Sequence, residues 1–374
     1  RPSVGVRGPF PVQMPRSVAS SPNPGAGAYW GMPFPSHTAA LIVGAGPIGL
    51  AVAISARRRG INPLVIDAGA IVNSIVRYPV GMHFFTTPER LEIGDHPITC
   101  SGLRVTREEA MMYYRGVVRT ERLDVRPWTR FVGAGRHGDQ WVARLALGGQ
   151  QHEIRADRLV LATGYFDHPN LIDVPGEGLP HVSHWFDEPH LCARQRVVVV
   201  GGKNSAVESA LLAWRAGAEV TLVHRGLELP PGVKYWLRPD FENRVKAGEI
   251  VPRLGCRVTA IAEATVRRAG RAGRSEELPA DRVYLLTGYH PDFDMLDRLG
   301  VELDPETGRA TVDPASLETN VPGLYLAGSV ASGRRISEVF IENGRFDGEK
   351  IFGDTTSQRR AEERYAASPR PIGE

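Results

Sequence analysis

The feature that most constrains the fold is a glycine-rich turn that follows an apolar run near the start of the chain. The stretch LIVGAGPIGLAVAISARRRG carries Gly44, Gly46 and Gly49 in the pattern G-x-G-x-x-G, between a predicted strand and a predicted helix. These glycines allow a tight turn, close approach of a pyrophosphate and close packing of the helix on the strand. The pattern predicts a dinucleotide site at the helix N-terminus or, if nothing binds, a plain strand–helix–strand unit.

An acidic residue at the end of the next predicted strand favours a dinucleotide. The stretch LVIDAG places Asp67, followed by Ala68, 23 residues after Gly44. A carboxylate at this spacing accepts hydrogen bonds from the hydroxyls of a ribose. We therefore expect the first unit to bind FAD.

The same unit recurs later in the chain with altered residues. In RVVVVGGKNSAVESALLAWRAGAEVTLVHR, Gly201 stands for the first glycine, Lys203 for the second and Ala206 for the third. The next strand ends in His224, again 23 residues on, and Arg225 follows. A cationic pair attracts a 2′-phosphate that a carboxylate would repel, so the second unit is predicted to bind NADPH. The Lys203 side chain stands where pyrophosphate approaches, so a degenerate site that binds nothing is the alternative.

Short β-branched apolar runs alternate with longer helical segments from residue 39 onward, which is typical of an α/β fold with parallel sheets. The predicted strands cover residues 41–43, 64–66, 159–161, 197–200, 220–223, 283–286 and 324–326. We expect two Rossmann-like βαβ domains. The FAD-binding domain comprises residues 39–174 and 289–354, and the NADPH-binding domain, residues 175–288, is inserted into it.

The two ends of the chain have compositions that do not predict a packed core. Residues 1–38 contain no acidic residue and many prolines and glycines, so we expect a disordered segment. Met32 is a plausible start, which would make residues 1–31 a tail or an upstream artefact. Residues 355–374 are polar and charged, and a frayed C-terminal tail is expected.

Composition excludes several classes of protein. The formal net charge is only +3 and no basic stripe is interleaved with aromatic residues, so no nucleic-acid partner is expected. No apolar run is long enough to span a membrane. The three cysteines, Cys100, Cys192 and Cys256, are far apart and odd in number, which fits a reducing cytoplasm. The histidines near Cys192 fit no standard metal spacing, so no metal is expected.

Further motifs resemble the two-dinucleotide flavoprotein disulfide reductases of the thioredoxin-reductase type. LVLATGYFDHPN and VYLLTGYHPD each contain a T-G turn like those that connect the nucleotide domains of this family, and NVPGLYLAGSVASG is similar to its final FAD segment. Within this group, FFTTPERLEIGD, GGKNSAVE, KYWLRPDFENRV and FIENGRFDGEK resemble the bacillithiol-disulfide reductase family. The resemblance implies that Lys203 is a family trait.

Three departures from these families bear on the chemistry. The redox C-x-x-C of true thioredoxin reductases is missing, which excludes thioredoxin reduction by that route. The first turn resembles that of the bacillithiol-type reductases, in which the sequence is G-P-C-G. This chain has G-P-I-G instead, with Ile48 in place of the cysteine. In the final FAD segment, Ser329 stands at the position where the family normally has an acidic residue. Its hydroxyl can still form a hydrogen bond with a ribityl chain.

The resemblance implies that NADPH reduces the flavin and that the reduced flavin passes electrons to a low-molecular-weight disulfide such as bacillithiol disulfide. A helix starting around Ile336 is expected to aim its N-terminus at the flavin pyrimidine. The catalytic residues stay unknown; Cys100, which follows GDHPIT, is a candidate for a thiol that approaches the flavin, and the alternative is a small buried or incidental cysteine. The alternatives are a ferredoxin or flavodoxin reductase, which would act on a small redox protein, and a non-catalytic redox sensor that binds FAD and NADPH. A homodimer is implied by the family alone.

The residues predicted to contact the two cofactors are Gly44, Gly46, Pro47, Ile48, Gly49, Asp67, Ala68, Thr163, Gly164, Gly201, Gly202, Lys203, Asn204, Ser205, Ala206, His224, Arg225, Gly288, Gly328 and Ser329.

Overall fold

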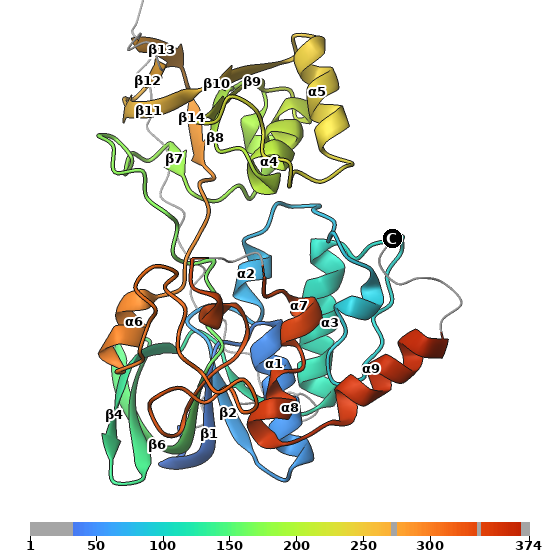
Figure 1. Ribbon diagram of the computed structural model, residues 1–374, viewed down its shortest axis with the longest axis vertical. Coiled ribbons are helices and arrows are strands. Elements are labelled where there is room, and N and C mark those ends of the chain that lie inside the picture. Colours follow the sequence, from blue (N-terminus) through green and yellow to red (C-terminus); the bar gives the residue numbers. More distant parts are fainter. Residues whose placement is uncertain (1–32, 271–274, 335–337, 368–374) are drawn as a thin grey trace, which may run out of the picture. The chain divides into compact units, whose positions relative to one another are not determined.

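The computed structural model describes residues 33–270, 275–334 and 338–367 of the 374-residue chain (Figure 1). The fold described below belongs to one compact unit, Phe34–Glu374. The predictions for residues 1–31 and for a start at Met32 lie outside the described residues. The expected end of the N-terminal segment at residue 38 is wrong. Strand β1 begins at His37, because residues 37 and 38 already pair with β6, and the Phe34 ring lies 4.8 Å from the His152 ring.

The first sheet contains seven strands within the described residues, in the order β3-β2-β1-β6-β5-β4, with β15 also paired to β6. Its strands are β1 (His37–Val43), β2 (Pro63–Ile66), β3 (Asp124–Arg126), β4 (Arg130–His137), β5 (Gln140–Leu147), β6 (Gln150–Leu161) and β15 (Leu324–Leu326). Strands β1, β2, β3, β6 and β15 pair in parallel, whereas β5 pairs antiparallel with both β6 and β4. The carboxyl ends of the parallel strands therefore share one edge.

Two further sheets are built from the chain between β6 and β15. The parallel one has the order β10-β9-β8-β14-β7 and the antiparallel one the order β11-β12-β13. Their strands are β7 (Val182–Ser183), β8 (Arg196–Val200), β9 (Glu219–His224), β10 (Ile250–Leu254), β11 (Cys256–Ile261), β12 (Thr265–Gly270), β13 (Ser275–Pro279) and β14 (Arg282–Leu285). Each predicted apolar run lies in a parallel strand, apart from Leu286, which follows β14. The predicted α/β class with parallel sheets is confirmed.

The helices of the described residues are α1 (Pro47–Arg58), α2 (Asn73–Val76), α3 (Arg107–Thr120), α4 (Asn204–Arg215), α5 (Arg238–Lys246), α6 (Phe293–Arg298), α7 (Ile341–Gly344), α8 (Asp347–Phe352) and α9 (Thr356–Ala367), with short 3-10 turns at Pro88–Arg90, Pro189–Cys192 and Gly328–Ser332. Helices α1, α3 and α8 pack on one face of the first sheet, and α4 and α5 pack on one face of the five-stranded sheet. No helix in the described ranges has the length and apolar character needed to cross a bilayer.

Alternation along β1 builds two cores, because successive side chains of a strand point to opposite faces. Ile42 packs with residues of α1, α3 and α8, whereas Leu41 and Val43 pack with Trp141 and with α6. In the five-stranded sheet one face packs against α4 and α5, and the other is covered by the antiparallel sheet β11-β12-β13. Each parallel sheet is thus a middle layer with a hydrophobic core on each of its two faces.

The expected frayed tail after residue 354 is instead helix α9 over most of its length. Its basic side chains reach acidic groups on the segment before α3. Arg364 Nη1 lies 2.6 Å from Glu92 Oε2, Arg360 Nη1 lies 3.0 Å from Asp95 Oδ2, and Ser357 accepts a hydrogen bond from Arg58. The polar composition of this stretch did not reveal the helix, because its partners are more than 250 residues away in the sequence.

We predict that Arg364→Met destabilises the fold by about 1–2 kcal/mol, because it leaves the Glu92 carboxylate, which is 6% exposed, without this partner. Urea unfolding measures the change. Arg359→Met on the same helix is the control, since Arg359 and Glu363 are 69% and 68% exposed and their pair should contribute less than about 0.5 kcal/mol. Equal effects of the two substitutions would contradict the docking of α9 through Glu92.

Candidate functional site

The three glycines of the first turn are each required for a different reason. Gly44 has φ +114°, and a Cβ there would lie 2.3 Å from the carbonyl oxygen of Ala162. A Cβ on Gly49 would lie 1.9 Å from the carbonyl oxygen of Gly44. Gly46, the N-cap of α1, has φ −71°, and a Cβ there would meet nothing within 4 Å. Gly46 therefore leaves open space in front of the helix N-terminus, which is the space a pyrophosphate needs.

The carboxylate of Asp67 is fixed at the carboxyl edge of β2. Its two oxygens accept hydrogen bonds from Ala45 N and Gly69 N, both at 2.8 Å. Burial raises the pKa of Asp67, while these two backbone N–H groups act in the opposite direction. Asp67 and Ala68 line the same cavity as Gly44 and Gly46. The acid is therefore beside the turn, as the spacing predicted, and it can accept from a ribose with its remaining lone pairs.

The turn after β6 and the final segment reach this cavity from the other side of β1. Thr163, Gly164 and Ser329 line it, and Thr163 Oγ1 is buried with no hydrogen-bond partner in the described structure. A buried hydroxyl of this kind is expected to be satisfied by a ligand or by water. The polar groups and the open space at Gly46 fit a dinucleotide such as FAD.

Ile48 fills a space between two glycines of the C-terminal part. A Cβ on Gly328 would lie 2.5 Å from Ile48 Cδ1, and one on Gly344 would lie 2.6 Å from the same atom. Gly328 itself does not line the cavity, and its N–H donates to Asp347 Oδ2 at 2.7 Å. Ile48 therefore both packs against the C-terminal part and lines the cavity.

The helix expected from Ile336 begins later. Residues 335–337 lie outside the described residues, and helix α7 starts at Ile341. Phe340 before it has an extended backbone, with φ −123° and ψ 178°, and its N–H donates to Asn343 Oδ1. This side-chain acceptor starts the helix at residue 341, and residues 339–342 line the cavity.

The second turn repeats the geometry of the first. Gly44 N donates to Ile66 O at 2.8 Å, and Gly201 N donates to Val223 O at 3.0 Å. Lys203 is the N-cap of α4, as Gly46 is of α1, and its φ of −94° and ψ of −172° are ordinary extended values. A lysine therefore fits this position without backbone strain, and its side chain is exposed.

His224 explains the second glycine of the pair at the start of this turn. A Cβ on Gly202 would lie 2.3 Å from the His224 ring, and one on Gly226 would lie 2.7 Å from it. Burial, followed by the neighbouring Arg225 guanidinium, lowers the pKa of His224. Of the two residues in the expected cationic pair, Arg225 is exposed, and both it and His224 line the cavity.

The cavity collects most of the predicted cofactor residues from both turns. Those that line it are Gly44, Gly46, Pro47, Ile48, Asp67, Ala68, Thr163, Gly164, Gly201, Gly202, Lys203, Ser205, His224, Arg225, Gly288 and Ser329. The others lie outside it for reasons of packing. Gly49 and Ala206 are buried against their own turns, and Asn204 Oδ1 accepts from Lys234 N at 2.9 Å.

Of the three cysteines, only Cys256 lines the cavity within the described residues. Cys100 does not line the cavity, and its Sγ donates to Gly102 O at 3.2 Å. Cys192 is fully buried. Cys256, for which the sequence offered no motif, lines the cavity after β10, and Arg268 Nη1 lies 2.6 Å from its sulfur. No group of three or more metal-ligating side chains occurs among the described residues.

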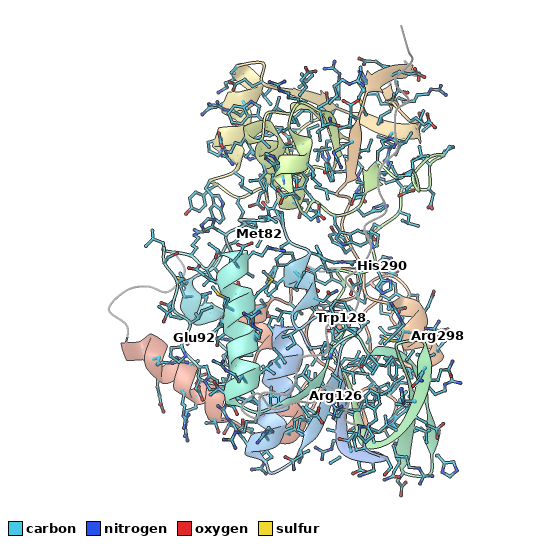
Figure 2. The ribbon with its side chains drawn as sticks, turned by 180° about the vertical axis from the view of Figure 1, so that it is seen from behind. Met82, Glu92, Arg126, Trp128, His290 and Arg298 are labelled. Carbon is cyan, nitrogen blue, oxygen red and sulfur yellow. The ribbon has the colours of Figure 1, made fainter. Side chains whose placement is uncertain are left out.

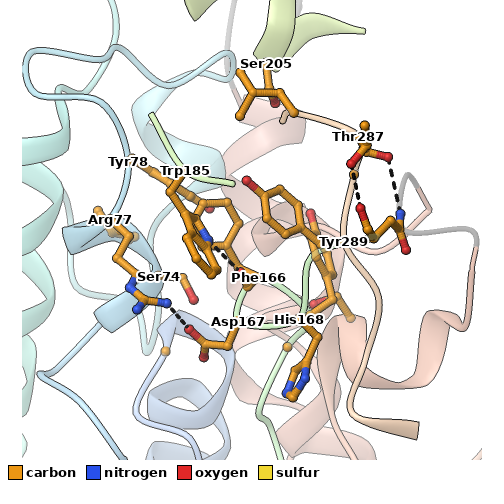
Figure 3. Close-up of a pocket in the computed structure, with 18 of the residues that line it drawn as sticks. Ser74, Arg77, Tyr78, Phe166, Asp167, His168, Trp185, Ser205, Thr287 and Tyr289 are labelled. Atoms are coloured by element: carbon orange, nitrogen blue, oxygen red, sulfur yellow. Dashed lines mark hydrogen bonds and ion pairs between the residues drawn. The ribbon is translucent and has the colours of Figure 1, made fainter. Parts of the chain in front are cut away.

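An aromatic cluster that the motifs did not reveal lines the cavity (Figure 3). The Phe166 ring lies 5.2 Å from that of Tyr78 and 4.6 Å from that of Tyr289, and Trp185 Nε1 donates to Phe166 O at 3.0 Å. Arg77 caps the Trp185 ring at 4.7 Å and pairs with Asp167 at 2.8 Å. A sequence signal was present, because T-G-Y follows both β6 and β14.

We predict that Gly44→Ala and Gly46→Ala have different effects. Gly46→Ala keeps the fold, because its Cβ meets open space, but lowers FAD affinity at least roughly tenfold by occupying the phosphate approach. Gly44→Ala destabilises the fold by more than about 2 kcal/mol through its clash with Ala162. Thermal unfolding and FAD titration of the apoprotein measure both. Full FAD affinity in Gly46→Ala would contradict this use of the turn.

We predict a pH dependence of stability that comes from Asp347. Burial raises its pKa to about 6, while the Gly328 N–H and Lys350 oppose the shift. Its folded pKa exceeds its unfolded pKa, so this carboxyl costs stability progressively as pH rises from about 4 to 6, by roughly 2–3 kcal/mol. Asp347→Asn keeps an acceptor for Gly328 and should lose that dependence. Unfolding midpoints at pH 4.5 and 7.5 test it, and parallel curves for the two proteins would refute it.

Comparison with known proteins places these features in a family. The model described as "Pyridine nucleotide-disulphide oxidoreductase" matches residues 41–328. Bacilliredoxin reductase Bdr of Bacillus subtilis (strain 168) is 40% identical over 314 residues, which are 83% of this chain and 95% of that protein. A ferredoxin–NADP reductase of Ignicoccus hospitalis is 28% identical over 308 residues, 78% of this chain and 89% of that protein.

A solved structure agrees with the sequence comparison. The bacillithiol disulfide reductase Bdr from Bacillus cereus is 40% identical, with a TM-score of 0.82, over 87% of this chain and 99% of that one. The resemblance inferred from the motifs is confirmed. The chain therefore belongs to the pyridine nucleotide-disulphide oxidoreductase family and, within it, to the Bdr-type flavin oxidoreductases, enzymes that use FAD and NAD(P)H.

Proposed function

We propose that the protein is an NADPH-dependent reductase of a low-molecular-weight disulfide such as bacillithiol disulfide. The observation that carries the proposal is that two equivalent strand–turn–helix units border one cavity, in a chain 40% identical to a bacillithiol disulfide reductase. In the overall reaction NADPH and a proton reduce the disulfide bond, which yields NADP⁺ and two thiols.

The residues of the first turn serve FAD. The N-terminus of α1 faces the open space at Gly46 for the pyrophosphate, and Asp67 accepts from the ribose. Thr163 and Ser329 offer hydroxyls to the ribityl chain and the ring system. When bound, FAD and NADPH supply the hydride transfer and the electrons that the acceptor takes.

The residues of the second turn serve NADPH. The N-terminus of α4 offers N–H groups to the pyrophosphate, and the exposed ammonium of Lys203 adds charge next to it. Arg225 carries the positive charge for a 2′-phosphate, because the pKa of His224 is lowered. This arrangement favours NADPH over NADH.

We predict that Arg225→Gln raises the KM for NADPH by roughly tenfold or more and leaves the KM for NADH unchanged, since only NADPH carries a 2′-phosphate. Steady-state flavin reduction with both nucleotides measures the change. Arg267→Gln is a matched control, because Arg267 pairs with Glu277 on the exposed β12–β13 hairpin. An equal loss for both nucleotides would show that Arg225 has another role.

The acceptor reacts without a cysteine from the first turn, because Ile48 stands in its place. Among the described cavity-lining residues Cys256 is the only cysteine, and it lies beside the second turn, where β10 ends next to β9. We therefore predict that a variant carrying Cys100→Ser, Cys192→Ala and Cys256→Ser keeps disulfide turnover within about threefold of the wild type. Loss of turnover in Cys256→Ser alone would place that thiol in the reaction.

The first experiment is anaerobic NADPH oxidation by the FAD-loaded protein with bacillithiol disulfide as the sole acceptor. Rapid turnover with release of two thiols supports the proposal. Reduction of the flavin without turnover would overturn the disulfide while keeping both cofactors.

A ferredoxin or flavodoxin reductase is the second candidate. It is favoured by one observation, that neither a C-x-x-C nor the first-turn cysteine is present, since transfer to a small redox protein needs no thiol. Ferredoxin and flavodoxin are therefore added as acceptors in parallel reactions, and turnover with these alone would support this candidate. We further expect a homodimer, as the family resemblance implies, and a cytoplasmic location; light scattering and cell fractionation test them.

A further inference from the structure

The exposed indole of Trp128 is a feature that the site described above does not use. Trp128 is 55% exposed and its backbone has φ +59°, a left-handed conformation that is unusual for a bulky side chain. Over the described ranges of the chain, no aromatic ring, cation or hydrogen-bond partner contacts the indole. Strain of this kind is retained where the surrounding structure fixes it, often at a ligand site.

Backbone hydrogen bonds place Trp128 beside the ribose-binding acid. Asp67 N donates to Arg126 O at 3.2 Å, Thr129 N donates to Asp67 O at 2.7 Å, and Trp128 N donates to Gly69 O at 2.9 Å. These bonds join the loop after β3 to the loop after β2. Trp128, labelled near Arg126 in Figure 2, lines the same cavity as Asp67.

The strand order gives the direction in which the cofactor crosses the sheet edge. The pyrophosphate site follows β1, the ribose acid follows β2, and the sheet continues as β3 on the same side. Neighbouring strands are about 4.8 Å apart, so a base attached to that ribose extends toward the carboxyl end of β3. Trp128 lies two residues after β3.

We propose that Trp128 is the stacking platform for the adenine base of FAD. The inference rests on the proposed FAD site. A planar indole offers a purine a large face, and such stacking contributes substantially to nucleotide binding. The flavin end is assigned to Thr163 and Ser329, beyond β1 on the side of β6 and β15, so Trp128 is a positioning residue that does not touch the reacting ring.

The test is a titration of the apoprotein with FAD, FMN and NADP⁺. Trp128→Ala should lower FAD affinity roughly ten- to a hundredfold. FMN, which lacks the adenylate half, should bind wild type and variant equally, and so should NADP⁺. Trp128→Phe should recover most of the FAD affinity. Indole fluorescence quenching by FAD should be smaller in Trp128→Phe than in the wild type.

Trp128→Gly separates the ring from the backbone, because glycine adopts φ +59° without strain. It should fold at least as well as the wild type and still lose FAD affinity as Trp128→Ala does. FAD affinities within twofold of the wild type for both variants would overturn the proposal. Failure of the wild type itself to bind FAD would instead overturn the FAD site, and it is seen before any variant is compared.

Discussion

The architecture depends on a close backbone contact that occurs once in each parallel sheet. Where β1 ends, Ala162 N donates to Val43 O at 2.8 Å, and Gly44 lies so near that a Cβ would sit 2.3 Å from Ala162 O. Where β8 ends, Leu286 N donates to Val200 O at 2.8 Å, and a Cβ on Gly201 would sit 2.6 Å from Leu286 O. Each contact brings a T-G-Y turn against a glycine turn at one sheet edge. The two units share this construction because only a glycine, which has no Cβ, lets the following turn approach the end of the strand this closely.

The two units differ in the residue at the carboxyl end of the second strand of each unit and in the N-cap of the helix. Asp67 is locked by two backbone N–H groups, so its carboxylate keeps a fixed direction at the end of β2. His224, at the equivalent position, packs on Gly202 instead, and the exposed Arg225 follows it. Lys203 is the N-cap of α4, as Gly46 is of α1. The N-cap has extended dihedral angles in both turns, so a lysine is accommodated there without strain. The lysine therefore leaves the backbone conformation of the turn unchanged, and its side chain affects only what a ligand meets there.

Ile48 links the first turn to the C-terminal part of the fold. Its side chain fills the gap that Gly328 and Gly344 leave, so this position is set by packing as well as by chemistry. A cysteine here would be smaller and would leave part of this space empty. Ile48 thus gives the first turn a contact with the C-terminal part of the fold, and no thiol stands at this position.

The sequence by itself determined the parallel strands, the two glycine turns and the acid after β2, because these depend on local periodicity and on fixed spacings. It also carried the family, through motifs such as G-G-K-N-S-A. It did not reveal helix α9, whose stability depends on Glu92 and Asp95, or the cluster of Tyr78, Trp185 and Tyr289, which meet only in the folded chain. Nor did it show that burial lowers the pKa of His224 or that Trp128 stands beside Asp67. These features were decided by tertiary structure, because burial and long-range neighbours set both the protonation of a side chain and the partners that it meets.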